Sequence, residues 1–533
     1  MAQSQTYSLR YKYMSNVLDE VFEPTPDIIS MMSGAGSKAP FLLAIDIGTS
    51  GIRAALFDES GVEINGTSVR TNRLSQGITD FSTIDASALL LQVVHALDAK
   101  LYEAQFYEAT TRIQLIAVSC FWHSLVGIDE SGRATTPVLG WADNRAAPAA
   151  LQLRSQLDES RIHARTGCRL HPSYWPAKLL RLRNEEPESF RATISWLSFA
   201  EYLALHLFGE FAVSVSMASA TGLLDQRTCE WDQELLETLD VSVESLPEIA
   251  SPNRAFHGLT PHYAARWPQL SEARMFPGIG DGAANNIGAG CTSKEKVALM
   301  IGTSGAMRVL FAGEPPSSVP PELWCYRADR TRVIVGGALS DGGGLYQRLR
   351  ESLLPGYDSE SIENELGCLE PDAHGLTILP FWAGERSVGW NAEAHGAILG
   401  LRLQTRSIEI LRAAMEAIAY RFALIARALE PLAPQATIMA SGNALGSSPT
   451  WAQILADVLG RRVIVSEPAE ASVRGAALLA LEAAGKIQSI EEISTSPASI
   501  AAAIFEPVMS RHALYQTAIE RQQRMYERII TKT

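Results

Sequence analysis

The sequence predicts an α/β protein with two related domains that face each other across a cleft. Its 533 residues exceed what one ordinary core holds, and a prior of roughly 150 residues per domain favours two large domains over several small ones. The pentapeptide IGTSG occurs twice, at 47–51 and 301–305. Each copy lies between short apolar, β-prone runs of the kind that form buried strands. We therefore expect each half of the chain to contain a similar β-hairpin.

The residues on either side of each repeat justify the two hairpins. FLLAID at 41–46 and GIRAALFD at 51–58 predict two strands, and VEINGTSVR at 62–70 predicts a third antiparallel strand. In the second half, VALMI at 297–301 and AMRVLFAG at 306–313 predict the same arrangement. The small residues between the strands then form the hairpin tips.

These tips suit phosphate oxygens. Glycine lets the backbone come close to a ligand, while amides and small hydroxyl groups donate hydrogen bonds to anionic oxygen. A single GTSG is compatible with a plain β-turn, but two copies in matching strand contexts favour two domains that each grip part of one polyphosphate. The candidate residues are Gly48, Thr49, Ser50, Gly302, Thr303 and Ser304.

The two copies differ in the residue that precedes them. Asp46 precedes the first copy and Met300 precedes the second. A carboxylate beside a phosphate site can hold Mg²⁺, directly or through water, because this ion prefers oxygen ligands and bridges nucleotide phosphates. Asp46 is therefore the candidate metal ligand, and the alternative is an Asp that caps its turn.

Composition excludes several classes of protein. An apolar content of 47% with 20% charged residues is typical of a globular chain with substantial cores. The net charge of −14 argues against nucleic-acid and anionic-membrane partners over most of the surface. Six cysteines without a CxxC pair are typical of reduced thiols in a cytoplasmic protein. No apolar run approaches the length of a membrane span, and residues 1–40 show no targeting pattern, so they are taken as an extension of unknown role.

A candidate catalytic carboxylate lies in PGIGDGAANNIGAG, where glycines flank Asp281. They allow a substrate to approach closely, and the carboxylate can accept a proton as an alcohol attacks phosphorus. The alternative is an Asx-turn or helix cap. Further on, QATIMASGN predicts a strand that ends in a turn, and Ser448 and Gly460 are expected to bound the following helix. Its N-terminus would offer an anion-binding corner.

Sugar-binding residues are expected in the N-terminal half. IQLIAVS at 113–119 predicts a strand, and the segment after it supplies polar groups for a polyol and an indole ring for its carbon chain. A lone His is more often structural than ligand-binding, so a substrate role for the His is one of two alternatives. The candidate residues are His123, Ser124, Trp141, Asp143 and Arg145.

Taken together, these segments resemble the FGGY carbohydrate kinases, members of the actin, Hsp70 and hexokinase superfamily. Five segments over residues 41–485 match in order: AIDIGTSGIRAALFD, PGIGDGAANNIGAG, the second IGTSG, SGNALGSSPTWAQILADVLGRRVIV and EASVRGAALLALEAAG. The resemblance implies two actin-like, ribonuclease H-like domains flanking a cleft, at 41–290 for sugar and phosphate and 291–533 for nucleotide. It also implies ATP and Mg²⁺ as cofactors and Asp281 as general base, and it leaves a homodimer open.

At the adenosine segment the family usually has two glycines where this chain has Gly442 and Asn443. Both are candidate nucleotide-binding residues. Because Asn is the non-glycine residue that best tolerates a positive φ, the turn is expected to survive this change.

Within the family, the chain looks most like gluconokinases, through HSLVGIDESG and WADNR in the N-terminal half and GGALSDGGGLYQ and FWAGERSVGWN in the C-terminal half, among other pieces. This similarity implies an aldonate substrate, D-gluconate, phosphorylated at its 6-hydroxyl to 6-phosphogluconate. Arg145 or Arg386 is expected to meet the carboxylate, and the alternative for each is an ion pair between loops. A kinase for xylulose or another polyol is the rival reading, and a non-enzymatic ATP-binding sensor or chaperone is a third.

Overall fold

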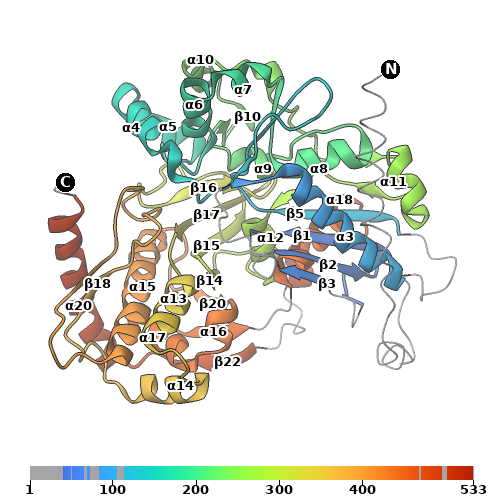
Figure 1. Ribbon diagram of the computed structural model, residues 1–533. Coiled ribbons are helices and arrows are strands. Elements are labelled where there is room, and N and C mark those ends of the chain that lie inside the picture. The colour runs from blue at the N-terminus through green and yellow to red at the C-terminus, as the bar shows by residue number, and fades with distance from the viewer. Residues whose placement is uncertain are drawn as a thin grey trace, which may run out of the picture.

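The computed structural model describes residues 40–49, 51–64, 69–72, 83–104, 113–466, 470–494 and 501–531. Within them the chain forms two seven-stranded sheets, each with its own helices (Figure 1). The expected extension at 1–40 lies outside the described residues except for its last position, and so does Ser50.

The first sheet contains the first expected hairpin, formed by β1 (Leu42–Ile47) and β2 (Gly51–Phe57), which pair antiparallel. A third antiparallel strand, β3 (Val69–Asn72), pairs with β2 and overlaps the end of the run 62–70 for which the sequence predicts this strand. On the other side, β5 (Leu115–Cys120) runs parallel to β1. The sheet is completed by β12 (Arg274–Met275) and β13 (Ile279–Gly280), parallel to β5, and by β11 (Phe256–His257) at the edge.

The second sheet repeats this order. β14 (Lys296–Ile301) and β15 (Gly305–Ala312) form the second hairpin, and β17 (Arg332–Leu339) pairs antiparallel with β15. β20 (Thr437–Ser441) runs parallel to β14, and β21 (Val463–Ser466) runs parallel to β20. The edges are β16 (Trp324–Arg327) and β22 (Ala501–Phe505). Three antiparallel strands followed by two parallel ones in both sheets confirm two related α/β units, an arrangement consistent with the actin-like superfamily.

A long insertion between β5 and β11 carries the N-terminal loops. Helices α4–α7 and α10 gather beyond the end of the first sheet (Figure 1). The helices of the insertion are α4 (Ala147–Gln156), α5 (Glu159–Thr166), α6 (Trp175–Glu185), α7 (Pro187–Ala192), α8 (Phe199–Phe208), α9 (Val215–Ser219) and α10 (Gln233–Leu239). Its short strands are β6 (Val126–Ile128), β7 (Val138–Leu139), β8 (Ser195–Leu197), β9 (Leu224–Asp225) and β10 (Glu230–Trp231), with 3₁₀ turns at Asn144–Ala146 and Val243–Ser245. Around the sheet itself lie β4 (Thr83–Ile84), α3 (Ala86–Ala104), α11 (Pro261–Arg266) and the 3₁₀ turn Pro268–Leu270.

The second sheet is covered by helices whose apolar faces form a separate core. The long helix α15 (Ser407–Leu429) buries Ile418 and Phe422 completely against it. The other elements of this half are α13 (Gly343–Leu353), α14 (Ser359–Cys368), β18 (Thr377–Leu379), β19 (Ala397–Leu399), α16 (Asn443–Gly446), α17 (Pro449–Leu459), α19 (Ile490–Ser494) and α20 (Met509–Ile529). Ser448 caps α17 and Gly460 ends it with φ of 63°, which confirms the bounds expected for that helix.

Two crossing helices join the halves. α12 (Asp281–Gly288) and α18 (Ala471–Ala483) approach so closely that a Cβ on Gly288 would strike the backbone of Ala471, and one on Gly475 would strike that of Ala284. α18 lies in sequence between β21 and β22 of the second sheet, yet Val473 and its neighbours pack into the core of the first. The division at residue 290 therefore stays a prediction, because the chain returns to the first core after it.

Five of the six cysteines are buried, Cys368 is exposed, and all six are free thiols. Among the described residues, no helix combines the length and the apolar character needed to cross a membrane.

Candidate active site

Asp281 is the first residue of α12, directly after β13. Its Oδ1 accepts hydrogen bonds from the backbone amides of Trp122 (3.3 Å) and Gly282 (2.9 Å). Burial raises the pKa of this carboxyl, while the charge of Arg308 and these two amides act in the opposite direction. The amides fix the position of the carboxylate, and the raised pKa makes it a stronger base than an exposed Asp.

Asp46 lies near Asp281 because β1, which contains Asp46, and β13, which directly precedes Asp281, both pair with β5. Its Oδ1 accepts a hydrogen bond from Ser119 Oγ (2.7 Å) and its Oδ2 one from Arg53 (3.1 Å). Burial raises the pKa of Asp46 to about 6, against the lowering effect of Arg53, and the charge of Asp281 adds to the rise. Arg53 also pairs with Glu470, so it does not fully compensate the charge of Asp46.

His123 ends the turn after β5 with a positive φ of 67°, a strained conformation for a non-glycine residue. Its Nδ1 lies 2.7 Å from the carbonyl oxygen of Ala220, so Nδ1 carries the proton and Nε2 is free to accept from Arg386 Nη2 at 3.1 Å. Burial and then the charge of Arg386 hold the pKa of His123 well below its usual value. His123 is thus a neutral residue that orients Arg386.

Arg386 comes from the second half of the chain. Its guanidinium lies over the Trp141 ring, 5.3 Å from the centroid, and the side chain is buried. Within the described residues it forms no ion pair with a carboxylate, and its Nε has no acceptor. The neighbouring Glu385 is engaged by Arg421 and by Tyr526 Oη.

Arg145 is held differently. Its Nε and Nη2 donate to the two oxygens of Asp143 at 2.8 and 2.7 Å, and half of its side chain is exposed. Burial alone would raise the pKa of Asp143, but Arg145 outweighs it and holds that pKa below its usual value. Ser124 is fully buried and accepts a hydrogen bond from the amide of Phe199. The expected set is therefore brought together only in part: His123, Trp141 and Arg386 meet, while Asp143 and Arg145 satisfy each other.

The second hairpin tip rests on a glycine-rich segment. Gly343 N donates to Gly302 O (2.7 Å) and Gly344 N to Thr303 O (3.0 Å). Thr303 is exposed and Ser304 half-buried, so their side chains remain accessible to a ligand. In the first tip, Gly48 N donates to Gly51 O (2.9 Å), and Gly48 and Thr49 are half-buried.

The adenosine segment differs from expectation in two ways. Gly442 has a φ of 109° and a Cβ there would strike Ile301 O, but Asn443 is the first residue of α16 with ordinary helical geometry. Tolerance of positive φ is therefore not what accommodates Asn443. The α17 N-terminus is also not an open anion site, because the carboxylate of Glu363 accepts from Thr450 N (2.7 Å) and Ser448 Oγ (2.8 Å).

Sequence reasoning missed two buried cations in this region. Lys178 donates to the carbonyl oxygen of His123 (2.7 Å), and burial lowers its pKa to about 7. Arg308 lies in β15, and burial lowers its pKa to about 10. A charged residue inside the apolar run AMRVLFA was the available signal for Arg308, because a buried charge in a strand needs a reason.

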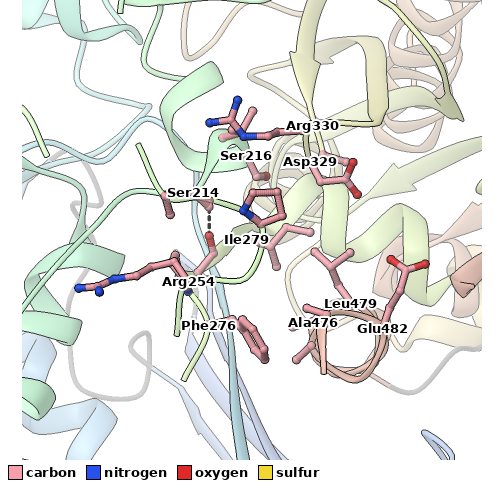
Figure 2. Close-up of a pocket in the computed structure, with 18 of the residues that line it drawn as sticks. Ser214, Ser216, Arg254, Phe276, Ile279, Asp329, Arg330, Ala476, Leu479 and Glu482 are labelled. Atoms are coloured by element: carbon pink, nitrogen blue, oxygen red, sulfur yellow. Dashed lines mark hydrogen bonds between the residues drawn. The ribbon is translucent and has the colours of Figure 1, made fainter. Parts of the chain in front are cut away.

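A cavity of about 320 Å³ lies behind the catalytic segment (Figure 2). One wall is α9, where Ser214 Oγ donates to Gly278 O (2.5 Å) and Ser216 Oγ accepts from Gly280 N (3.1 Å). The other wall is α18, with Leu479 and Glu482. These serines hold the segment 278–280, which directly precedes Asp281.

Comparison with known proteins settles the family. The N-terminal domain model of the FGGY family of carbohydrate kinases matches residues 41–288, and the C-terminal domain model matches residues 297–484. The chain belongs to this family. It is an ATP-dependent carbohydrate kinase.

Relatives of more than one substrate type are similar to this FGGY kinase. It is 28% identical to a gluconokinase of Bacillus subtilis (strain 168), over 85% of this chain and 90% of that protein. It is 25% identical to a xylulose kinase of the same organism, over 92% and 97%. Among solved structures, a gluconate kinase from Lactobacillus acidophilus superposes with a TM-score of 0.80 and 26% identity, over 92% of this chain and 98% of that one.

Proposed function

We propose that this FGGY kinase transfers the γ-phosphoryl group of ATP to the 6-hydroxyl of D-gluconate, giving 6-phosphogluconate. The observation that carries the proposal is Arg386, a buried guanidinium over Trp141 that has no carboxylate partner within the described residues. A neutral sugar would leave this cation unpaired, at a cost of roughly 1 to 3 kcal/mol. An aldonate supplies the missing charge, and similarity to gluconokinases agrees with it.

In the proposed mechanism, the sugar acid lies between the two halves, with Arg386 at its carboxylate and Asp281 at its reacting hydroxyl. Asp281 accepts the proton as the oxygen attacks phosphorus. The amides of Trp122 and Gly282 hold the carboxylate in place for that transfer. Closure of the cleft would exclude water and limit ATP hydrolysis.

The phosphates would lie between the two hairpin tips, with Gly48, Thr49, Ser50, Gly302, Thr303 and Ser304 around them, and Gly442 and Asn443 near the adenosine. Asp46 fits Mg²⁺, because its charge is incompletely compensated and its pKa rises to about 6. A divalent ion would neutralise phosphate charge there. A cytoplasmic location fits six free thiols.

The substrate proposal is tested by a coupled ADP-release assay over gluconate, xylulose, ribulose and glycerol. Gluconate should be used at least about tenfold more efficiently, since about 1.4 kcal/mol of discrimination gives that factor. Arg386→Ala should weaken gluconate more than any neutral substrate, and Arg145→Ala, whose Arg already pairs with Asp143, provides the matched comparison. If xylulose or glycerol is the better substrate, the gluconokinase proposal is wrong and the family assignment remains.

A further inference from the structure

Arg308 lies in the middle of β15 and reaches the helix that begins at the catalytic Asp. In the sheet it is opposite Gly336 of β17, which is opposite Trp324 of β16, so the three positions share one face. A Cβ on Gly336 would lie 2.7 Å from Arg308 Cγ. Likewise, a Cβ on Gly282 would strike both the Arg308 guanidinium and the Trp122 ring. Two glycines therefore make room for this one side chain.

Within the described residues, the Arg308 guanidinium has no hydrogen-bonding or ion-pair partner. The residue is 3% exposed and its Nε is buried without an acceptor. No hydrogen bond or ion pair of its side chain is found in the described part of the chain. Asp281 attracts it electrostatically, but the hydrogen bonds that the Asp281 carboxylate accepts come from backbone amides. Buried charges that only stabilise a fold are normally paired, because an unpaired buried charge is costly. Arg308 is therefore a candidate for binding a ligand.

Arg308 and Arg386 approach two neighbouring rings of the first half. Arg308 lies beside the Trp122 ring at Gly282, Arg386 Nη2 lies 3.1 Å from His123 Nε2, and the centroids of these two rings are 6.4 Å apart. The two positive charges are therefore close enough to repel each other, and, after burial, the charge of Arg386 accordingly acts to lower the pKa of Arg308. They come from different loops and strands of the second half and face His123 and Trp122 of the first. Two buried guanidinium groups without a contacting carboxylate create a site whose repulsion an anion relieves.

We propose that Arg308 acts with Arg386 to bind the carboxylate of the sugar acid, and that Arg308 sets the selectivity for aldonates over neutral sugars. The inference rests on the proposed function and adds a specificity residue to it. A guanidinium fits a carboxylate through two parallel N–H donors, a match that a hydroxymethyl group cannot reproduce.

The test compares gluconate with D-glucitol, which has the same carbon chain and a hydroxymethyl group in place of the carboxylate. Steady-state rates are measured for the full chain and for Arg308→Met, Arg308→Lys and Arg327→Met. Arg327 is the matched control: it is similarly buried on β16, on the far side of β17 from β15, but donates to Gln226 O, Arg330 O and Glu314. ATP affinity and melting temperature are recorded for every variant.

Arg308→Met should lower kcat/KM for gluconate by about 30-fold or more, mainly through KM, and change that for glucitol by less than about threefold. Arg308→Lys should recover part of the loss because it restores the charge but not the fork of donors. Arg327→Met should lower the melting temperature and leave the ratio of the two substrates unchanged.

One outcome would overturn the role of Arg308, and another would overturn the proposed function. If the natural chain prefers gluconate but Arg308→Met weakens both substrates equally, Arg308 serves Asp281 or the transferred phosphate, and this inference is wrong while the proposed function stands. If the natural chain prefers xylulose to gluconate, the proposed function itself is wrong. If the Arg308→Met protein binds neither ATP nor sugar, the test uses Arg308→Lys instead. A ratio of kcat/KM for gluconate to that for glucitol equal to the ratio of the natural chain would then contradict the inference.

Discussion

The two IGTSG hairpins have the same place in their sheets and different registers. In the first, Ile47 pairs with Ile52, which leaves four residues in the tip. In the second, Ile301 pairs with Gly305, which leaves three. A Cβ on Gly305 would lie 2.6 Å from the Phe422 ring, so packing against α15 holds this glycine in the strand.

The residues before the tips differ more. Asp46 is flanked by Arg53 on one side and Ser119 on the other, while Met300 is flanked by Ala306 and Ser441. The backbone repeats, but a carboxylate directly before the tip occurs only in the first copy. The comparison teaches that a duplicated fold can repeat its hairpin backbone in both halves while the proposed metal ligand, Asp46, has a counterpart without charge, Met300, in the second half.

The largest loss of activity should come from changing Asp281, which follows β13 in the same sheet as the first hairpin. Asp281→Asn should reduce kcat by about 10² to 10⁴, the usual range for loss of a general base. ATP affinity, measured by calorimetry, should change less than about twofold because the residue contacts no nucleotide-binding tip. Near-normal turnover would remove Asp281 from the mechanism.

The asymmetry between the tips can be tested directly with Asp46→Ala and Met300→Ala. The first should raise the Mg²⁺ concentration for half-maximal activity by about tenfold, because a carboxylate ligand is lost. The second should lower the melting temperature without changing metal dependence. Equal metal dependence in the two variants would show that the carboxylate has no metal role.

The pH dependence sharpens the same comparison. Since the pKa of Asp46 is raised from 3.8 to about 6, the stability that its neutral form contributes is fully present below about pH 3.8 and is lost as pH rises through about 6. Mg²⁺ needs the ionised form. The stabilisation of the protein by added Mg²⁺, measured as a shift in melting temperature, should therefore be small at about pH 5 and larger at about pH 7.5. Asp46→Asn should abolish that difference, and a pH-independent shift would contradict the site.

A smaller effect is expected at the adenosine segment of the second half. Gly442→Ala should lower the melting temperature, because the residue has a left-handed φ and its Cβ would strike Ile301 O. Asn443→Gly should change the KM for ATP by less than about threefold, because Asn443 is already helical. A large gain in ATP affinity would mean that the side chain, not the backbone, obstructs the nucleotide.

The last comparison concerns α20, which lies beyond the matched family domains. Tyr526 Oη donates to Glu385 Oε2 at 2.6 Å, next to Arg386. Tyr526→Phe should raise the KM for gluconate by about threefold and leave kcat unchanged, because one hydrogen bond that positions the Arg386 loop is lost. Arg521→Met, which breaks a different α20 contact to Asp372, is the control. The same KM change in both would indicate general loosening of the helix.

Much of the fold could be predicted because its signals are local. Apolar runs around a glycine-containing turn specify a hairpin, and Ser448 with Gly460 specifies a helix. The candidate site was harder to predict from the sequence. The sequence supplied Asp281 and Asp46 through their glycine and strand contexts. Nothing local distinguished Arg145, which pairs with Asp143, from Arg386, which has no carboxylate partner among the residues that the structure describes.

The sequence by itself determined the two hairpins, the order of strands and helices that belongs to the FGGY kinases, and the difference between Asp46 and Met300. Only the tertiary structure decided which charges are satisfied. Arg308 and Arg386 are far apart in sequence from Asp281 and His123, and the N-terminus of α17 is filled by Glu363 from another helix. Hydrogen bonding and burial depend on distances between segments that local patterns do not encode, so the electrostatics of a site built from both halves appear only when those halves have packed together.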